Sequence, residues 1–462
     1  MITSVISSPT IWSPAYNPII WMVDSDQVGQ FKFKYVFDVF IAGATAGIRY
    51  KVPPNPSGVG IIDVSSIVQT ELTINENLPM LSAYPFYLGT GMATEVYILA
   101  GEEYSLTATG TPIIYDGFGF VGEPRYGLYA DGDFAPAPNY ISPVVVYAAA
   151  QSPIDYYDYR STGGETIQDY TMTSTTSKFL TLCPNNPQDI RSDEDFTLSW
   201  INWDLYAATG PRAVPYAMKA TLKLSGATAG TEVYYNTLGE GGGSWTTNTS
   251  FPERSAATGP SDPKFYLNNF KFNPIDIVTP AFDSVTLQLF SYETYGATGL
   301  GATGISEPIN LTINDDNCWG FEPIRFTWLN SLGGRDWYTF IKRNTNTQNA
   351  NRQTFYQLPG YWSGSSFPVT DISPARYGTT VYNVQLQNSW TASTDWITPE
   401  ESEWLRSMFA SPSVHAYLPG RSQPTLVTIT DGSYETQSYA RQKLFQYFVS
   451  FVEAQSDTVQ GY

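Results

Sequence analysis

The stretch from Cys318 to Arg343 constrains the fold most, because it joins two aromatic runs through one sharp turn. Between Phe321 and Leu329 the side chains follow the period of two that a β-strand requires. The pattern predicts that Arg325 and Thr327 face outward and that the inner face holds Phe321, Ile324, Phe326 and Trp328. The neighbouring Gly333 and Gly334 tolerate the positive φ of a chain reversal, so the sequence predicts a buried β-hairpin.

The polar residues around the turn show no pattern typical of a catalytic or binding site. Charged side chains beside a strand usually face water. We therefore interpret four of them as solvated flanks: Arg335, Asp336, Lys342 and Arg343.

Composition extends this prediction to the whole chain. Of 462 residues, 15% are aromatic, with 33 Tyr, 37 Gly and 32 Pro. Aromatic side chains suit a pleated sheet, and Gly and Pro end its strands. The length also exceeds that of one ordinary core. We expect an all-β, mainly antiparallel, multi-domain protein with immunoglobulin- or fibronectin III-like β-sandwiches and one short C-terminal helix.

Four segments are expected. Residues 1–72 are predicted to form an N-terminal immunoglobulin-like β-domain. Residues 73–178 are predicted to form an irregular connecting segment rich in Tyr, Gly and Pro. Residues 179–317 predict a second β-sandwich, and residues 318–462 a C-terminal β-domain with one helix.

Within the first segment, residues 31–40 alternate as a half-buried strand, and residues 44–47 form the turn of a hairpin. A short helix through Leu72 is expected there, with Asp63, Ser65 or Ser66 as its N-cap.

The second sandwich is predicted from six strand-like runs: 196–200, 217–224, 231–235, 264–272, 285–290 and 309–313. A short tag recurs along the chain, as Ala-Thr-Ala-Gly at Ala44 and Ala227 and as Ala-Thr-Gly at Ala108, Ala208, Ala257, Ala297 and Ala302. Its uneven spacing excludes a solenoid, so we interpret the tags as loop tips. The sequence alone offers no reason for their reuse.

In the last segment, residues 345–352 are rich in Asn and Gln and are predicted to be a loop, with strands at 381–386, 414–418, 425–429 and 444–452. The helix is expected between Thr398 and Ser411. Thr398 as N-cap and Glu401 three residues later form a capping box, and Pro399 occupies the first helical position. The buried stripe comprises Trp404, Leu405, Met408 and Phe409.

Net charge limits the partners. The formal charge of −19 repels a phosphate backbone, so sequence-specific nucleic-acid binding is not expected. An acidic surface suits a conduit through which DNA slides, and it equally suits ordinary solubility. No basic region precedes an apolar one at the N-terminus, and Val144–Ala150 is too short to span a bilayer, so neither secretion nor membrane insertion is expected.

Candidate sites are few, and we predict no catalytic, cofactor-binding or metal-binding residue and no cofactor. The one histidine, His415, lies in a predicted strand without a nucleophile elbow. Asp131-Gly132-Asp133 lacks the downstream acids of a calcium loop. A glycosidase-type depolymerase needs only two carboxylates, but the acids at 193–195 and 315–316 are interpreted as solvated strand ends.

Two further features keep alternatives open. Cys183 and Cys318 are expected to be buried thiols, although one bridge between them is also compatible with the sequence. The run from Tyr156 to Arg160 is either an interface segment or a strand edge.

Three stretches resemble one family. The run from Leu329 to Phe340 resembles a motif of virion proteins of tailed bacteriophages that infect Bacteroidota, including crAss-like podoviruses. Two further stretches resemble the same family, one near each end of the chain: Trp12–Ile20 with Pro56–Ser65, and Ile429–Tyr434 before Lys443–Phe445. Taken in order, the three stretches resemble the skeleton of that family. The resemblance covers a minor part of the chain. It implies a structural part of the tail or neck, and it carries over no functional residue.

The expected function is therefore a structural component of a phage virion, not an enzyme. The chain would be made soluble in the host cytoplasm and would join a homo-oligomeric ring, hub or baseplate-like assembly with neighbouring virion proteins. The alternative is a receptor-binding or glycan-binding tail module, for which exposed Trp and Tyr rings would suit sugar stacking.

Overall fold

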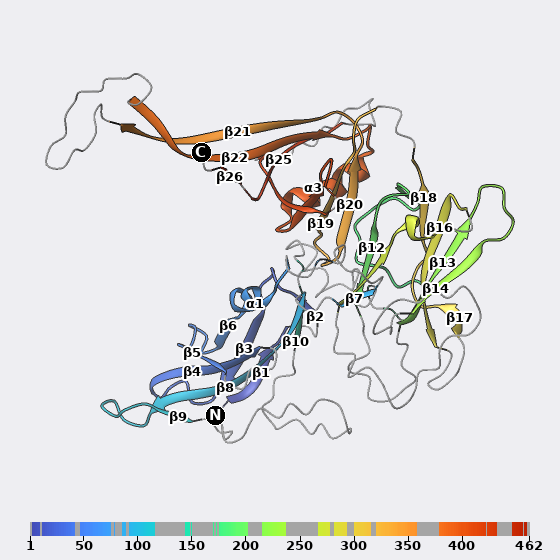
Figure 1. Cartoon of the computed structure of the whole chain (residues 1–462). Coiled ribbons are helices and arrows are strands. Elements are labelled where there is room, and N and C mark those ends of the chain that lie inside the picture. The colour runs from blue at the N-terminus through green and yellow to red at the C-terminus, as the bar shows by residue number, and fades with distance from the viewer. Residues whose placement is uncertain are drawn as a thin grey trace, which may run out of the picture. The chain divides into compact units, whose positions relative to one another are not determined.

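The computed structural model (Figure 1) describes residues 2–9, 12–41, 47–74, 78, 86–88, 92–115, 144–147, 149, 170, 172, 175–201, 215–236, 267–277, 281–292, 300–315, 320–357, 378–421, 423–431, 446–455 and 457–459. The chain divides into two compact units. The first comprises Met1–Asp315 with Asn330–Asp336, and the second comprises Asp316–Leu329 with Trp337–Tyr462. The described residues are mostly strands in antiparallel sheets, which confirms the all-β class.

The first unit begins with two facing sheets. The smaller has the order β1 (Ile2–Ser7), β3 (Ile20–Ser25), β6 (Gly60–Asp63). The larger has the order β2 (Trp12–Pro14), β10 (Val144–Tyr147), β8 (Ala93–Ser105), β4 (Phe31–Ile41), β5 (Ile48–Val52), and β9 (Ile113–Tyr115) pairs with β8. Contacts between the sheets define their shared core. A Cβ at Gly60 would overlap the ring of Tyr35, and the Ser25 hydroxyl donates to Glu102 at 2.7 Å.

A second pair of sheets follows in the same unit. The larger has the order β11 (Gln188–Ile190), β18 (Ile309–Ile313), β16 (Ser284–Tyr292), β13 (Pro215–Lys223), β14 (Thr231–Asn236), and β17 (Leu300–Gly304) pairs with β16. The smaller has the order β12 (Phe196–Ile201), β15 (Leu267–Phe272), β7 (Phe86–Leu88). Tyr235 of β14 meets Phe270 of β15 edge to face at 4.9 Å between ring centroids, so these sheets also share a core.

Both pairs of sheets share one connectivity. In each, the first strand of the larger sheet runs parallel to the last one along the chain, β2 with β10 and β11 with β18. A short helix follows the smaller sheet's strand in each pair: α1 (Ser65–Glu71) after β6, and the 3-10 helix η3 (Pro274–Asp276) after β15. An extra strand pairs with β8 in one and with β16 in the other.

This shared connectivity accounts for the positions of some of the recurring tags. The two Ala-Thr-Ala-Gly runs fall in equivalent connections, between β4 and β5 and between β13 and β14. The Ala-Thr-Gly runs at Ala108 and Ala297 likewise fall after β8 and β16. The tags at Ala208, Ala257 and Ala297, and residues 44–46 of the tag at Ala44, lie outside the described residues. The tag at Ala302 lies within β17, so its prediction as a loop tip is wrong.

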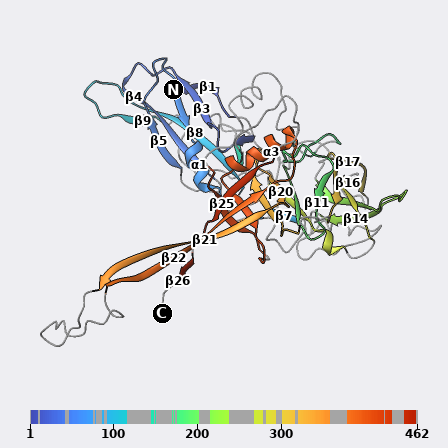
Figure 2. The ribbon, with the colours of Figure 1, turned by 90° about the horizontal axis from the view of Figure 1, so that it is seen from above.

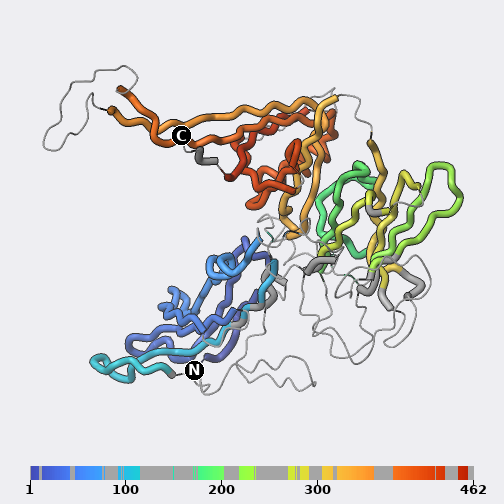
Figure 3. Tube along the Cα trace, in the orientation of Figure 1, coloured from blue at the N-terminus to red at the C-terminus, as the bar shows by residue number. Residues whose placement is uncertain are grey.

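The second unit contains one large sheet. Its order is β20 (Arg335–Phe340), β19 (Ile324–Leu329), β23 (Val414–Tyr417), β24 (Thr425–Ile429), β25 (Phe448–Glu453), β22 (Gly378–Ser393), β21 (Asn344–Gln357), and β26 (Asp457–Val459) pairs with β22. The first two residues of β20 belong to the first unit. The tube in Figure 3 shows β21 and β22 extending away from the other strands of this sheet.

The predicted helix is confirmed as α3 (Pro399–Ala410). Thr398 accepts from the backbone N–H of Glu401 and the Glu401 carboxylate accepts from that of Thr398, which completes the capping box. Trp404, Leu405 and Met408 are buried, and the ring of Trp404 lies 5.5 Å from that of Trp328 on β19.

Several sequence predictions are wrong. Both faces of β19 are covered, so Arg325 and Thr327 are buried, while Phe321 is 38% exposed. Both faces of β4 are likewise buried from Val36 onward, so only its first half alternates as predicted. Residues 93–105, placed in the irregular segment, form β8, the central partner of β4.

Two local predictions also fail. The N-cap of α1 is Val64, which makes no side-chain cap, whereas Asp63 accepts from the N–H of Ile19 and of Ser65. Residues 345–352, predicted to be a loop, lie within the strand β21.

Candidate assembly surface

The candidate catalytic histidine lies inside the sheet of the second unit. His415 of β23 is 3% exposed and stands in register between Thr327 of β19 and Leu426 of β24. Among the residues that the structure describes, no cluster of three His, Cys, Asp or Glu side chains is arranged to hold a metal ion.

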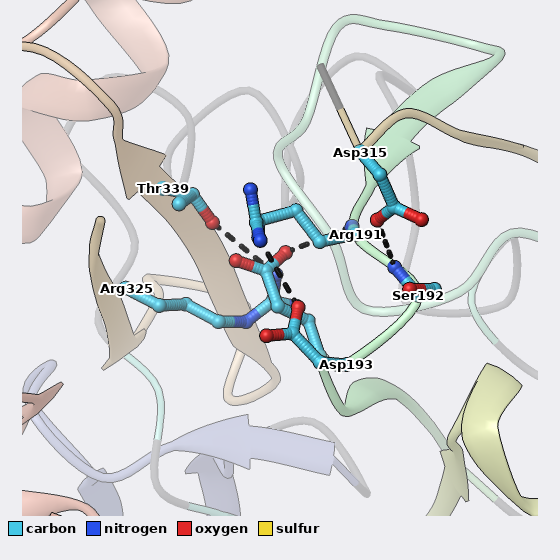
Figure 4. Close-up of polar contacts among 7 residues, drawn as sticks. Arg191, Ser192, Asp193, Asp315, Arg325 and Thr339 are labelled. Atoms are coloured by element: carbon cyan, nitrogen blue, oxygen red, sulfur yellow. Dashed lines mark hydrogen bonds and ion pairs between the residues drawn. The ribbon is translucent and has the colours of Figure 1, made fainter. Parts of the chain in front are cut away.

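The acidic run at 193–195 shapes a turn in the first unit (Figure 4). Asp193 pairs with Nε of Arg191 at 3.1 Å, and Glu194 accepts from the backbone N–H of the same arginine at 3.0 Å. Asp315 accepts from the N–H of Ser192 at 2.8 Å. Asp193 is solvated as predicted. Glu194 is only 8% exposed, because its carboxylate accepts the backbone hydrogen bond from Arg191 within the turn.

Arg325, also labelled in Figure 4, has a structural role in the second unit. Its Nη1 donates to Oγ1 of Thr339 at 3.3 Å, and its guanidinium lies 4.5 Å from the ring centroid of Trp337. Such a cation–π contact attracts the guanidinium to the face of the aromatic ring.

The hairpin tip is buried in the first unit. Asp336 accepts from the Thr181 hydroxyl at 2.6 Å and from the N–H of Leu182 at 3.2 Å. Arg335 donates to the carbonyl of Ile74, and burial lowers the pKa of its guanidinium to about 10, so it remains charged at neutral pH. The prediction that Arg335 and Asp336 are solvated flanks is therefore wrong, because partners distant in sequence enclose them. Lys342 is also largely covered, with a side chain that is 12% exposed and pairs with Asp395 at 3.0 Å, whereas Arg343 is exposed as predicted.

Other candidates are only partly described. Cys183 is partly exposed, and its thiol donates to the carbonyl of Asn185 at 3.9 Å. Cys318, Asp316, the residues 131–133 and the run 156–160 lie outside the described residues. The expectation of a buried thiol is therefore wrong at Cys183, and the bridge to Cys318 stays an untested alternative.

The most unusual surface of the described chain is the ribbon, by which we mean β21 and β22 together. The two strands pair antiparallel from Asn344 with Ala392 to Gln357 with Gly378 (Figure 1). Figure 2 shows the ribbon extending away from the rest of its own sheet. All but two of the 14 residues of β21 are exposed, so neither face of this strand is covered along its length.

The chemistry of the ribbon is polar but almost uncharged. β21 contains four Asn, three Gln and three Thr among its 14 residues, and Arg352 is its one charged residue. The 16 residues of β22 include no charged side chain. No acid thus lies on this surface, although the whole chain carries a formal charge of −19.

The ribbon is anchored to the sheet at one end. The buried carboxylate of Glu453 on β25 accepts from the side chains of Asn388 and Trp390, each at 3.1 Å, and from Arg421 at 2.6 Å. The rings of Trp390 and Phe451 stack with centroids 6.4 Å apart. These contacts fix the direction in which the ribbon leaves the sheet.

The opposite end carries an exposed apolar group, which we call the distal cluster: Phe355, Tyr356, Val381 and Tyr382, at 48%, 64%, 43% and 60% exposure. The register shifts between Gln353 and Thr354, which leaves Tyr382 as the extra residue of a β-bulge. The rings of Phe355 and Tyr382 lie 6.1 Å apart. Consecutive residues of a strand face opposite sides, so apolar groups occupy both faces.

Sequence reasoning missed this surface. A strand exposed on both faces has no alternation of apolar and polar residues, and Asn is depleted in strands generally. The available signal was the length of a Pro-free polar stretch, with Arg352 as its one charge, soon after a buried strand.

Comparison with known proteins does not identify a relative: no family model matches the chain, and no curated protein shows significant sequence similarity to it. Within the described residues, no helix is both long and apolar enough to cross a membrane.

Proposed function

We propose that this protein is a structural subunit of the tail or neck of a tailed bacteriophage, which assembles with copies of itself and with neighbouring virion proteins into a ring, hub or baseplate-like body. The ribbon carries this proposal. Beyond the segments where β25 and β26 pair with β22, the ribbon has only two strands, and a two-stranded ribbon is at best marginally stable alone in water. β21 is also exposed along nearly its whole length. Such an element gains its full stability when a neighbouring subunit covers it.

The fold of the first unit supports the proposal. We infer that its two pairs of sheets are immunoglobulin-like sandwiches, since each has a three-stranded sheet facing a larger one and a first strand parallel to the last. Rigid modules of this kind suit a structural body. The motif resemblance to phage virion proteins provides the assignment to the tail or neck.

The proposal includes no enzymatic activity and no cofactor. The candidate groups considered above have structural partners: His415 lies within a sheet, and Glu194 and Asp336 satisfy backbone N–H groups. We place the protein in the virion, after synthesis in soluble form in the host cytoplasm.

The distal cluster favours one alternative, a glycan-binding or receptor-binding module. Exposed aromatic rings beside amide side chains suit the stacking and hydrogen bonding of a sugar, and Phe355 and Tyr382 lie near the amides of Gln353 and Asn383 in the register. A glycan array with the wild-type protein and with Tyr382→Ala tests this alternative.

Light scattering and negative-stain electron microscopy of the purified full chain test the main proposal. We expect a discrete oligomer larger than a dimer, visible as rings or compact bodies. A strict monomer at high protein concentration would contradict a self-assembling subunit.

A further inference from the structure

We propose that the outer edge of β21 pairs antiparallel with the same edge of a second copy of this chain, across a twofold axis. This inference rests on the proposed function, because it names the partner of the ribbon. The sheets of the two copies would join into one continuous sheet through their β21 strands.

The edge is available for such pairing. β21 ends the strand order of its sheet, and none of the described strands pairs with its outer side. Natural proteins protect exposed edges with Lys, Pro, inward charges or short strands. β21 has 14 residues with neither Lys nor Pro, so it lacks these protections.

Charge favours a second copy as the occupant. Copies of a chain with a formal charge of −19 repel each other over most of their surface. The ribbon contains no acid, so two ribbons meet without that repulsion. A basic partner would instead be attracted to the acidic surface elsewhere on the chain.

The side chains of β21 are also self-complementary. The amides of Asn and Gln each contain donors and acceptors, so an Asn/Gln-rich strand matches a copy of itself. Paired Thr residues contribute in the same way across strands.

Symmetry defines the register. In a symmetric antiparallel pair the twofold axis passes midway between one residue and the same residue of the other copy, and Ala350 lies near the middle of β21. With the axis there, Asn349 lies opposite Asn351 of the other copy, and Arg352 lies opposite Gln348. The two Arg352 side chains thus avoid each other.

A charge exchange tests the pairing. The acidic variant is Asn349→Asp with Asn351→Asp, and the basic variant is Asn349→Lys with Asn351→Lys; both positions are exposed, so the fold should persist. Like charges directly opposite each other destabilise a strand pair, so we expect each variant alone to associate at least about tenfold more weakly than wild type. An equimolar mixture should restore association, because unlike charges then meet.

The matched control places the same charges on an internal strand. Thr428→Asp with Thr430→Asp alters exposed residues at the end of β24, whose backbone pairs with β23 and β25. This variant should associate as wild type does. Circular dichroism and thermal unfolding establish that all variants are folded.

Analytical ultracentrifugation separates the outcomes. Loss in each variant and recovery in the mixture support pairing between β21 strands. Wild-type association in both variants, or loss without recovery in the mixture, overturns the inference and leaves the assembly proposal intact. Failure of the wild-type chain itself to associate counts against the proposed function as well.

Discussion

The tip of the hairpin, Asn330–Asp336, shows how single residues determine this fold. The Asn330 side chain donates to the carbonyl of Leu180 at 2.9 Å and accepts from the N–H of Leu332 and of Gly334. One amide thereby closes the turn and attaches it to a segment 150 residues earlier in the chain.

Gly334 is required by close packing at this tip. A Cβ there would overlap the carbonyl of Leu180, so we expect Gly334→Ala to destabilise the protein by about 1–3 kcal/mol. Gly29→Ala is the control, because a Cβ at Gly29 meets nothing within 4 Å. Urea denaturation measures both, and equal stability of the two variants would contradict the predicted overlap.

Tyr338 provides a prediction about pH. Burial raises the pKa of its hydroxyl, and the carboxylates of Glu401 and Asp395 add to the rise. Between the ordinary pKa of about 10 and the higher pKa of the folded state, only the unfolded chain releases this proton. Stability should therefore fall as pH rises above about 10, and less steeply in Tyr338→Phe.

Denaturant unfolding at a series of alkaline pH values measures this difference in slope. Identical slopes in the wild type and in Tyr338→Phe would show that Tyr338 ionises equally in the folded and unfolded states.

Buried polar residues mark the limit of sequence prediction at this scale. The pattern around Gly333 and Gly334 correctly predicted a turn, because the chain reversal is local. The burial of Arg335 and Asp336 depends on Ile74, Thr181 and Leu182, and no local pattern identifies partners so distant in sequence.

At the scale of elements, α3 was the most predictable part of the chain. Its start is encoded by adjacent residues, with Thr398 and Glu401 each satisfying a backbone N–H of the other. We expect Thr398→Ala to reduce stability by about 1 kcal/mol and Thr398→Ser to leave it nearly unchanged. Thermal unfolding measures both, and an equal loss in the two variants would argue against a capping effect.

The strands divide into predictable and unpredictable ones for a physical reason. The six runs of the second sandwich correspond to β12, β13, β14, β15, β16 and β18, since aromatic and β-branched residues mark them. β21 could not be predicted, because its Asn, Gln and Thr residues do not alternate with apolar residues. β21 is stabilised by its pairing with β22, and the sequence of β21 alone does not show this.

The anchor of the ribbon provides a further prediction. Glu453→Ala removes the acceptor of Asn388, Trp390 and Arg421, and leaving the buried N–H of Trp390 unsatisfied costs about 1–3 kcal/mol. We expect faster hydrogen exchange in residues 388–393 of β22. Glu403→Ala, which removes a carboxylate that is 64% exposed, is the control and should leave that exchange unchanged. Equal exchange in both variants would contradict the anchoring role.

At the scale of the whole molecule, two repeated pairs of sheets form the first unit and one large sheet forms the second. The all-β class followed from composition. The shared connectivity could not be predicted from composition, because it joins strands as distant along the chain as β2 and β10. The recurring tag was the feature of the sequence that reflected it.

Removal of the ribbon tests the central claim most directly. Residues 350–386 would be replaced by Asn-Gly, which forms a tight turn between the paired Asn349 and Gln387. The change removes the outer part of the ribbon, including the residues of β22 that pair with β26. We predict that the truncated protein keeps the secondary structure of both units but sediments as a smaller species than the oligomer of the full chain, because the contact between β21 strands is lost. Sedimentation of the truncated protein as the same oligomer would contradict assembly through the ribbon.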